Sequence, residues 1–174
     1  MDMTAYVIQA LASRGVTVES IAKVVYSLQK QYLPELTLST CEKSVMAVLA
    51  KREAQHAILT GLALDQLAEE KRLPQPLQDI VERDEPLYGV DEILALAITN
   101  IYGSVGLTSF GYLDKRKTGI IGRLDSRPGG VNTFLDDLVA GIAAAASARL
   151  AHQSGRTRES EMDEPAAFPT GATG

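Results

Sequence analysis

The chain has 174 residues, a formal net charge of −5 at pH 7, one Cys and two His. A single Cys excludes an internal disulfide framework and a multi-cysteine zinc module, and two His argue against a His-rich metal site. The acidic balance argues against a nucleic-acid binder, because such binding rests on many Lys and Arg contacts to phosphate. The length suits one domain that can bury its own core.

The beginning of the chain, MDMTAYVIQALASRG, has no basic residue ahead of its apolar stretch, so it does not resemble a secretory signal. No segment contains the roughly 18–20 uninterrupted apolar residues that cross a bilayer as a helix. These features predict a cytoplasmic protein.

Apolar residues recur at helical spacing along most of the chain, whereas strict alternation of β-branched and aromatic residues is scarce. This pattern predicts a single all-α bundle of six or seven helices. The predicted helices cover residues 4–13, 17–32, 39–72, 75–83, 90–101, 103–113 and 131–152.

Two helix starts and one helix break can be predicted from local signals. Thr17 is placed as an N-cap, and Ser39 stands three residues before Glu42, which is the spacing of a capping box. The run 39–72 is long for a globular helix, so we expect a break near Thr60-Gly61.

The last predicted helix is unusually apolar. No charge interrupts Leu138–Ala148, and the residues of 140–147 (AGIAAAAS) are mostly small. Small residues let helices approach closely, which predicts a central position for this helix and favours homo-oligomers. Residues 154–174 are rich in Ser, Gly, Pro, Thr and charge, so a disordered tail is predicted after a domain of residues 1–153.

Carboxylates gather in three stretches of the second half. Asp91-Glu92 opens an apolar helix, where the helix dipole alone would favour acids. Asp114 and Lys117 are three apart and share a helix face, as in a surface ion pair or in a site that pairs a cation with a phosphate.

The third stretch joins acids to the apolar helix. Asn132 and Asp136 are four apart on one helix face, and Asp136-Asp137 leads directly into uncharged residues. Buried ionised carboxylates need a cationic partner, although a capped pair at a helix start is an equally good interpretation. Oxygen donors without soft ligands suit Mg²⁺, which can neutralise charge on a phosphoryl group.

These stretches, in this order, resemble the phosphatidylglycerophosphatase A family over about residues 88–152. The matching pieces are Asp91-Glu92, then Asp114 with Lys117 and Asp125, and finally Gly129-Gly130 followed by Asp136–Gly141. The family removes the terminal phosphate of phosphatidylglycerophosphate with Mg²⁺. The well-known members are integral membrane proteins, and this chain is most similar to a shorter, soluble branch found as stand-alone bacterial proteins.

The resemblance implies a role for each matching residue and a phospholipid phosphate as substrate. Lys117 would contact the phosphate, with Arg123 and Asn132 as further candidate substrate contacts. Transient contact with the inner membrane surface would involve the basic stretch Lys115–Arg127. The implied metal-side and catalytic carboxylates are Asp91, Glu92, Asp114, Asp125, Asp136 and Asp137.

Two other functions remain open at this point. An all-α nucleotide pyrophosphohydrolase would also bind Mg²⁺ through helical carboxylates, and Glu82-x-x-Glu85 has the spacing of one of its turns, without a matching second turn. A non-catalytic helical interaction or regulatory protein would keep the same acids for stability and would show no effect of divalent ions.

Overall fold

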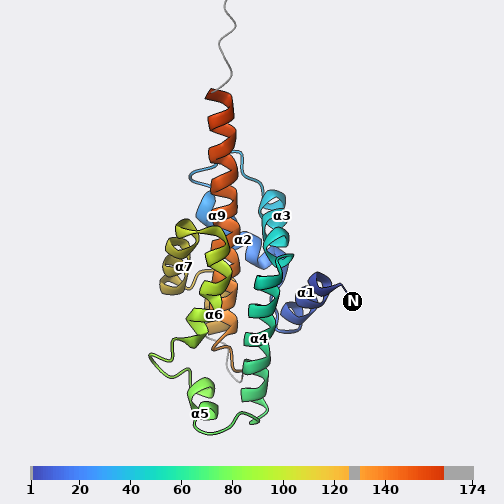
Figure 1. Ribbon diagram of the computed structural model, residues 1–174, viewed down its shortest axis with the longest axis vertical. Helices are drawn as coiled ribbons and strands as arrows, with labels where there is room; N and C mark the ends of the chain where they lie inside the picture. The colour runs from blue at the N-terminus through green and yellow to red at the C-terminus, as the bar shows by residue number, and fades with distance from the viewer. Residues whose placement is uncertain (1, 126–129, 163–174) are drawn as a thin grey trace, which may run out of the picture.

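The structure, a computed structural model, describes residues 2–125 and 130–162, with side chains as far as residue 155. The described residues form helices and no strand, which confirms the all-α prediction (Figure 1). The helices are α1 (Met3–Ser13), α2 (Val18–Gln29), α3 (Leu38–Leu49), α4 (Arg52–Glu69), α5 (Leu77–Glu82), α6 (Val90–Thr99), the 3₁₀ turn η1 (Asn100–Tyr102), α7 (Ser104–Arg116), α8 (Ile120–Asp125) and α9 (Leu135–Met162).

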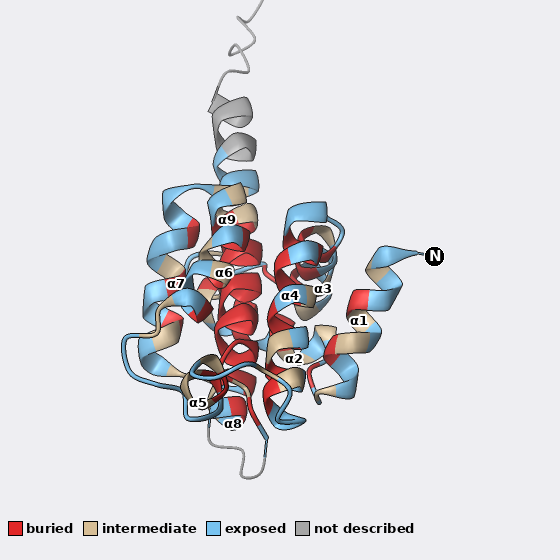
Figure 2. Cartoon of the chain, turned by 60° about the horizontal axis from the view of Figure 1, so that its bottom comes forward, coloured by how far each residue is buried: buried red, intermediate tan, exposed pale blue. Residues whose placement is uncertain are grey.

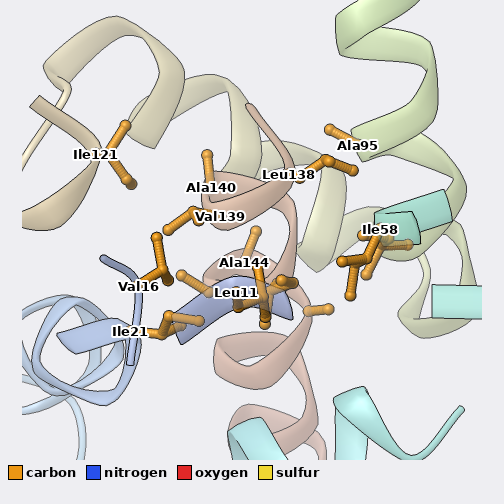
Figure 3. Close-up of a cluster of buried hydrophobic side chains, with 14 of the residues drawn as sticks. Leu11, Val16, Ile21, Ile58, Ala95, Ile121, Leu138, Val139, Ala140 and Ala144 are labelled. Carbon is orange, nitrogen blue, oxygen red and sulfur yellow. The ribbon is translucent and has the colours of Figure 1, made fainter. Parts of the chain in front are cut away.

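Helix α9 is the centre of the bundle, as its apolar sequence predicts. It contacts α2, α3, α4, α6, α7 and α8, and every residue from 135 to 148 is buried (Figure 2). Figure 3 shows how Leu138, Val139 and Ala144 of α9 meet side chains from the surrounding helices. A helix that is apolar on all sides is stable in water only when other helices cover it completely.

Two glycines allow helices to approach α9 closely. A Cβ on Gly61 of α4 would lie 2.6 Å from Leu138 Cδ1, and a Cβ on Gly141 of α9 would lie 2.9 Å from the backbone oxygen of Ala95 in α6. Because neither contact leaves room for a side chain, these positions set the spacing of α4, α6 and α9. Helices α6 and α9 carry acidic first turns, so their spacing also sets the distance between those acids.

Gly61 explains why the predicted break in the run 39–72 was misplaced. The break falls at Ala50-Lys51, where Lys51 is extended, and Gly61 lies inside α4. The glycine serves helix packing and does not end the helix. The predicted N-cap at Thr17 is confirmed, with its side chain accepting from the backbone of Ser20.

Three further features of the helices differ from the prediction: the cap of α3, the presence of α8 and the start of α9. Thr37, not Ser39, caps α3 by accepting from the backbone of Thr40. Helix α8 was not predicted, and α9 begins at Leu135, since residues 131–134 form its lead-in.

The C-terminal end of α9 also differs from the sequence prediction. The backbone is helical as far as Met162, whereas the last predicted helix ended at residue 152. The segment 154–162 contains no proline and several good helix formers. The rest of the predicted tail, 163–174, lies outside the described residues. Among the helices of the described ranges, none has the length and apolarity needed to span a membrane.

Candidate functional site

The first acidic turn belongs to α6. Gly89, in the left-handed region at φ 69°, ends the preceding loop and starts the helix, which places Asp91 and Glu92 in the first turn. Asp91 is buried, and its Oδ1 atom has no hydrogen-bond partner among the described residues, whereas Glu92 is exposed. A buried carboxylate oxygen without a protein partner is costly, and a water molecule or a cation can satisfy it.

The lysine of the site lies at the end of α7. Lys117 is the C-cap and adopts the left-handed conformation at φ 47°, which turns the chain away from the helix axis. A Cβ on Gly122 would lie only 2.2 Å from the backbone oxygen of Lys117. The small residue of α8 therefore allows the backbone at Lys117 to make this turn.

The second acidic turn belongs to α9, and a buried acid of α4 holds its start. Asp65, which is fully buried, accepts from the backbone N–H of Phe134 through Oδ1 (3.1 Å) and from that of Leu135 through Oδ2 (3.0 Å). The carboxylate satisfies two of the donors that a helix start leaves unpaired. Asp136 and Asp137 follow directly, each 5% exposed.

An ion pair between α1 and α4 holds the segment that leads into α9. Glu69 accepts from the guanidinium of Arg14 and from the backbone N–H of Val131 (2.8 Å). The same guanidinium donates to the backbone oxygen of Val131 and to Asn132 Oδ1. The lead-in to Asp136 is therefore anchored to residues that lie between 62 and 118 positions earlier in the chain.

The Lys117 ammonium contacts acids of two of the three acidic stretches, the one around Asp114 and the one that contains Asp136. It donates to Asp136 Oδ2 at 2.6 Å and lies 3.5 Å from Asp114 Oδ1 and 3.4 Å from Asp125 Oδ1. The predicted pairing of Asp114 with Lys117 is present, and the shorter contact is to Asp136. Three carboxylates around one ammonium leave this part of the site with a net negative charge.

Asp114, Lys117 and Asp136 line a pocket of about 390 Å³ between the α5–α6 loop and the starts of α6 and α9. The loop contributes Asp84, Glu85 and the apolar residues Pro86 and Leu87 to its wall. The acidic residues of the pocket far outnumber its one lysine. The charged side chains that line it are Asp84, Glu85, Asp91, Glu92, Asp114, Lys117, Asp136 and Asp137.

Burial and crowding raise the pKa values of the pocket acids. For Asp137, burial and then repulsion from Asp136 and Asp114 raise the pKa to about 8. Burial also raises the pKa of Asp136 to about 6, although the hydrogen bond from Lys117 opposes the shift. A helix N-terminus favours ionised acids, but here the desolvation of closely spaced carboxylates is the larger effect.

Lys117 remains charged in this setting. Burial lowers its pKa, but the hydrogen bond and negative charge of Asp136, with further charge from Asp137 and Asp125, outweigh burial and raise it. The pocket thus contains a permanent cation beside Asp136 and Asp137, whose pKa values are raised toward the neutral range. Such perturbed groups in one cleft are typical of a functional site.

The stability of the protein without divalent cations is expected to fall as the pH rises from about 5 to about 8. The pKa values of Asp65, Asp136 and Asp137 are raised to about 7, 6 and 8, so the folded state holds protons that the unfolded chain has released. Rising pH then favours the unfolded chain. Thermal melts in a chelating buffer check this, and Asp137→Asn should flatten the upper part of the profile. A melting temperature that rises over this range contradicts the raised pKa values.

The structure brings most of the predicted site residues together in the acidic pocket, but not all of them. Asp91, Glu92, Asp114, Lys117, Asp136 and Asp137 line the acidic pocket. Asp125 and Asn132 lie in an adjoining depression that shares Asp84 and Asp136 with the pocket. Arg123 lines a different pocket, beside Lys23 of α2, because α8 directs it toward α2.

Two residues of the site were missed by sequence reasoning. Asp84 lines both the acidic pocket and the adjoining depression, and burial, followed by the charge of Asp91, raises its pKa. Its place in an acid-rich loop just before Asp91 was a signal that could have found it. Asp65 gave no such signal, since its partners are 69 and 70 residues away in sequence.

The carboxylate oxygens that line the pocket are the donors that a hard cation prefers, although they do not form a closed set of ligands. In the described parts of the chain, no three His, Cys, Asp or Glu side chains are grouped closely enough to hold a metal ion. The Lys117 ammonium lies among the carboxylates instead. Mg²⁺ retains several waters and commonly uses one or two carboxylates plus substrate phosphate, so the partnerless Asp91 Oδ1 and the crowded Asp136 and Asp137 fit it.

Comparison with known proteins assigns the chain to a family. The family model for phosphatidylglycerophosphatase A matches residues 7–152. The chain belongs to the phosphatidylglycerophosphatase A family. Membership implies a phosphatase, a phosphoric monoester hydrolase, that acts in phospholipid metabolism. The match begins in α1 and includes every residue of the acidic pocket.

Two bacterial relatives are similar to this chain over most of its length. The uncharacterised Bacillus subtilis protein YpjQ is 60% identical over 156 residues, which cover 88% of each chain. Its crystal structure has a TM-score of 0.86 and covers 89% of this chain and 96% of that one. The crystal structure of the low temperature requirement C protein of Listeria monocytogenes has a TM-score of 0.86 at 51% identity, over 89% of this chain and 98% of that one.

Proposed function

We propose that this protein is a Mg²⁺-dependent phosphatase that removes the terminal phosphate of phosphatidylglycerophosphate or a related lipid phosphate. The observation that carries the proposal is the pocket that acids of α6, α7 and α9 line together with Lys117, whose ammonium contacts Asp114 and Asp136. Family membership supports a phosphomonoester as the substrate. The pocket is large enough for a phosphate group with bound water and a cation.

The carboxylates of Asp91, Asp136 and Asp137 are the proposed metal-side ligands, with Asp114 and Glu92 as further oxygen donors. A bound Mg²⁺ would neutralise charge on the phosphoryl group and lower the pKa of a coordinated water. Asp91 Oδ1 is buried without a protein partner, and the raised pKa of Asp137 reflects burial and then repulsion from Asp136 and Asp114, which a divalent cation would relieve. Binding of the cation should therefore release protons at neutral pH.

Lys117 is the proposed phosphate contact. Its ammonium stays protonated because its pKa is raised, and it is held by three carboxylates at 2.6–3.5 Å. An incoming phosphate oxygen can replace one of these carboxylates as the acceptor without the lysine leaving the pocket. Its position at the left-handed end of α7 keeps the side chain directed at the start of α9.

A nucleotide pyrophosphohydrolase site is less well supported by the geometry. Glu82 binds Lys71 and accepts from Gln78 Nε2, so it is engaged with α5 and the preceding loop. Of the two glutamates of the Glu82-x-x-Glu85 turn, only Glu85 lines the acidic pocket. The paired turns that such an enzyme needs do not meet there.

An assay of phosphate release tests the proposal. Short-chain phosphatidylglycerophosphate dispersed in detergent is expected to lose phosphate with Mg²⁺ and to be inert with excess chelator, while nucleoside triphosphates release nothing. In parallel, Mg²⁺ should raise the melting temperature of the wild type and raise that of Asp114→Ala less, because a ligand bound only to the folded state stabilises it.

Three outcomes would reject the proposal. Release of pyrophosphate from nucleoside triphosphates, without release of phosphate from the lipid, would favour the pyrophosphohydrolase. Phosphate release that persists in excess chelator would show that the reaction does not need a metal ion. No release and no effect of Mg²⁺ on the melting temperature would favour a non-catalytic helical protein. Asp79→Asn, a change at a partly exposed acid of α5 that does not line the acidic pocket, is the matched control, and it should behave as wild type in both measurements.

A further inference from the structure

The α5–α6 loop carries an apolar side chain at the mouth of the acidic pocket. Leu87 lines the pocket and is 103% exposed, the highest value for a large hydrophobic residue in the described ranges. Its backbone lies in the left-handed region at φ 66°. Figure 1 shows the loop, between α5 and α6, standing away from the bundle.

Leu87 contributes no burial to the folded chain and occupies a conformation that branched side chains disfavour. Glycine or asparagine would make the same turn at lower cost and without exposing an apolar surface. The loop itself is anchored one residue later, where the ring of Tyr88 packs edge-on against Phe134 at 5.9 Å. A fixed loop therefore presents a leucine to its surroundings.

Two further apolar side chains continue this surface onto α6. Val90 is 44% exposed and Ile93 is 64% exposed. They are three residues apart in one helix, so they share a face. We call Leu87, Val90 and Ile93 the apolar lip. The lip thus extends from the wall of the acidic pocket along the outer side of the first turn of α6.

We propose that the apolar lip inserts into the surface of a lipid bilayer and brings the pocket to phosphates at the membrane. This inference rests on the proposed function, because a lipid phosphate enters the pocket while its acyl chains stay in the membrane. Leu87 lies where the pocket meets those chains. Aliphatic side chains of this kind bind at the headgroup boundary through buried apolar area.

A bilayer fits the lip better than a second copy of the chain. The exposed parts of three aliphatic side chains amount to less than about 400 Å², about half of what each partner contributes to a stable protein interface. Glu85 and Glu92 flank the lip, so attraction to anionic lipid does not drive the contact. Binding should then depend little on salt, unlike binding through the basic stretch 115–127.

Flotation with phosphatidylcholine vesicles tests the lip. Wild type is expected to float with the vesicles at low and high salt alike. Leu87→Asn and Ile93→Gln should each lower the partition coefficient of the protein between vesicles and buffer by about tenfold. Tyr32→Gln is the matched control, because Tyr32 is 65% exposed and lies away from the acidic pocket, and it should bind as wild type.

Turnover separates this inference from the proposed function. Ile93 does not line the pocket, so Ile93→Gln should keep its turnover of dispersed short-chain lipid phosphate and lose turnover of the same headgroup in vesicles. If wild type binds vesicles through the lip but releases no phosphate from dispersed lipid, the proposed function is rejected and membrane binding by the lip is still supported.

Other results would overturn the lip. Wild type that does not float, variants that float as well as wild type, or binding abolished by high salt would each do so. A dimer in sedimentation that Leu87→Asn and Ile93→Gln dissociate would assign the surface to a second copy. The melting temperature of Leu87→Asn should equal or exceed that of wild type, which shows that lost binding does not result from unfolding.

Discussion

Asp137→Asn is expected to lower phosphate release from the lipid substrate by at least about a thousandfold while the fold survives. Asp137 lines the acidic pocket and is 5% exposed. Its pKa is raised to about 8, so without a cation the carboxyl is mostly neutral at pH 7, and Asn has nearly the same shape. The substitution therefore removes only the charge that a bound cation requires.

The measurement is kcat/KM together with thermal melts with and without Mg²⁺. Without Mg²⁺, the melting temperature of Asp137→Asn should match that of wild type, and the increase caused by Mg²⁺ should shrink. Asp136→Asn should show a similar loss of turnover, with Lys117 still held by Asp114 and Asp125. Turnover equal to wild type in both variants would remove these residues from the site.

Asp65→Ala is expected to cause the largest loss of stability of any change at the site, about 3 kcal/mol, or a fall of about 10 °C in melting temperature. Asp65 is fully buried and accepts from the N–H groups of Phe134 and Leu135. Alanine would leave both donors buried and unpaired at the start of α9. Asp136 and Asp137 would lose their fixed position, so turnover should fall as well.

Two variants separate this effect from a general loss of charge. Asp65→Asn keeps one acceptor oxygen and should lose about half as much stability. Asp79→Ala, at a partly exposed acid of α5 that lies 3.9 Å from Arg83 and accepts from Gln75 Nε2, should change stability by less than about 1 kcal/mol. A melting temperature of Asp65→Ala equal to that of wild type would show that the cap at α9 is not needed.

The acidic pocket joins two properties that family membership alone does not explain. Its acids are buried close together, and burial and mutual repulsion raise the pKa values of Asp136 and Asp137. The Lys117 ammonium partly neutralises their charge. A cation that binds there adds stability and displaces protons. Activity, metal affinity and folding stability should therefore change together with pH.

The helical pattern made the fold class predictable, whereas helix boundaries depended on distant contacts. Apolar spacing identified most of the helices and the central position of α9. The break predicted at Gly61 was wrong because a glycine inside a helix either weakens it or lets a neighbour approach, and only the packing of Leu138 against α4 shows which. The lead-in before Leu135 is likewise held by residues of α1 and α4.

For the site, the sequence located acids and the tertiary structure chose their partners. The pairs Asp91-Glu92 and Asp136-Asp137 were recognisable as first-turn acids. The closest carboxylate to Lys117 is Asp136, nineteen positions away, and no spacing rule predicts that contact. Arg123 was grouped with Lys117 because of proximity in sequence, but it lies in a different pocket.

By itself, the sequence determined that the chain is helical, that its last long helix is buried on all sides, and that acids stand at the starts of two helices. These are properties of single elements, set by side-chain spacing and local hydrogen bonding. The tertiary structure alone decided that Asp65 caps α9, that Asp84 joins the pocket, and that Leu87 lies exposed at its mouth. Those relations depend on which faces of distant helices pack together, and close packing is a property of the whole bundle.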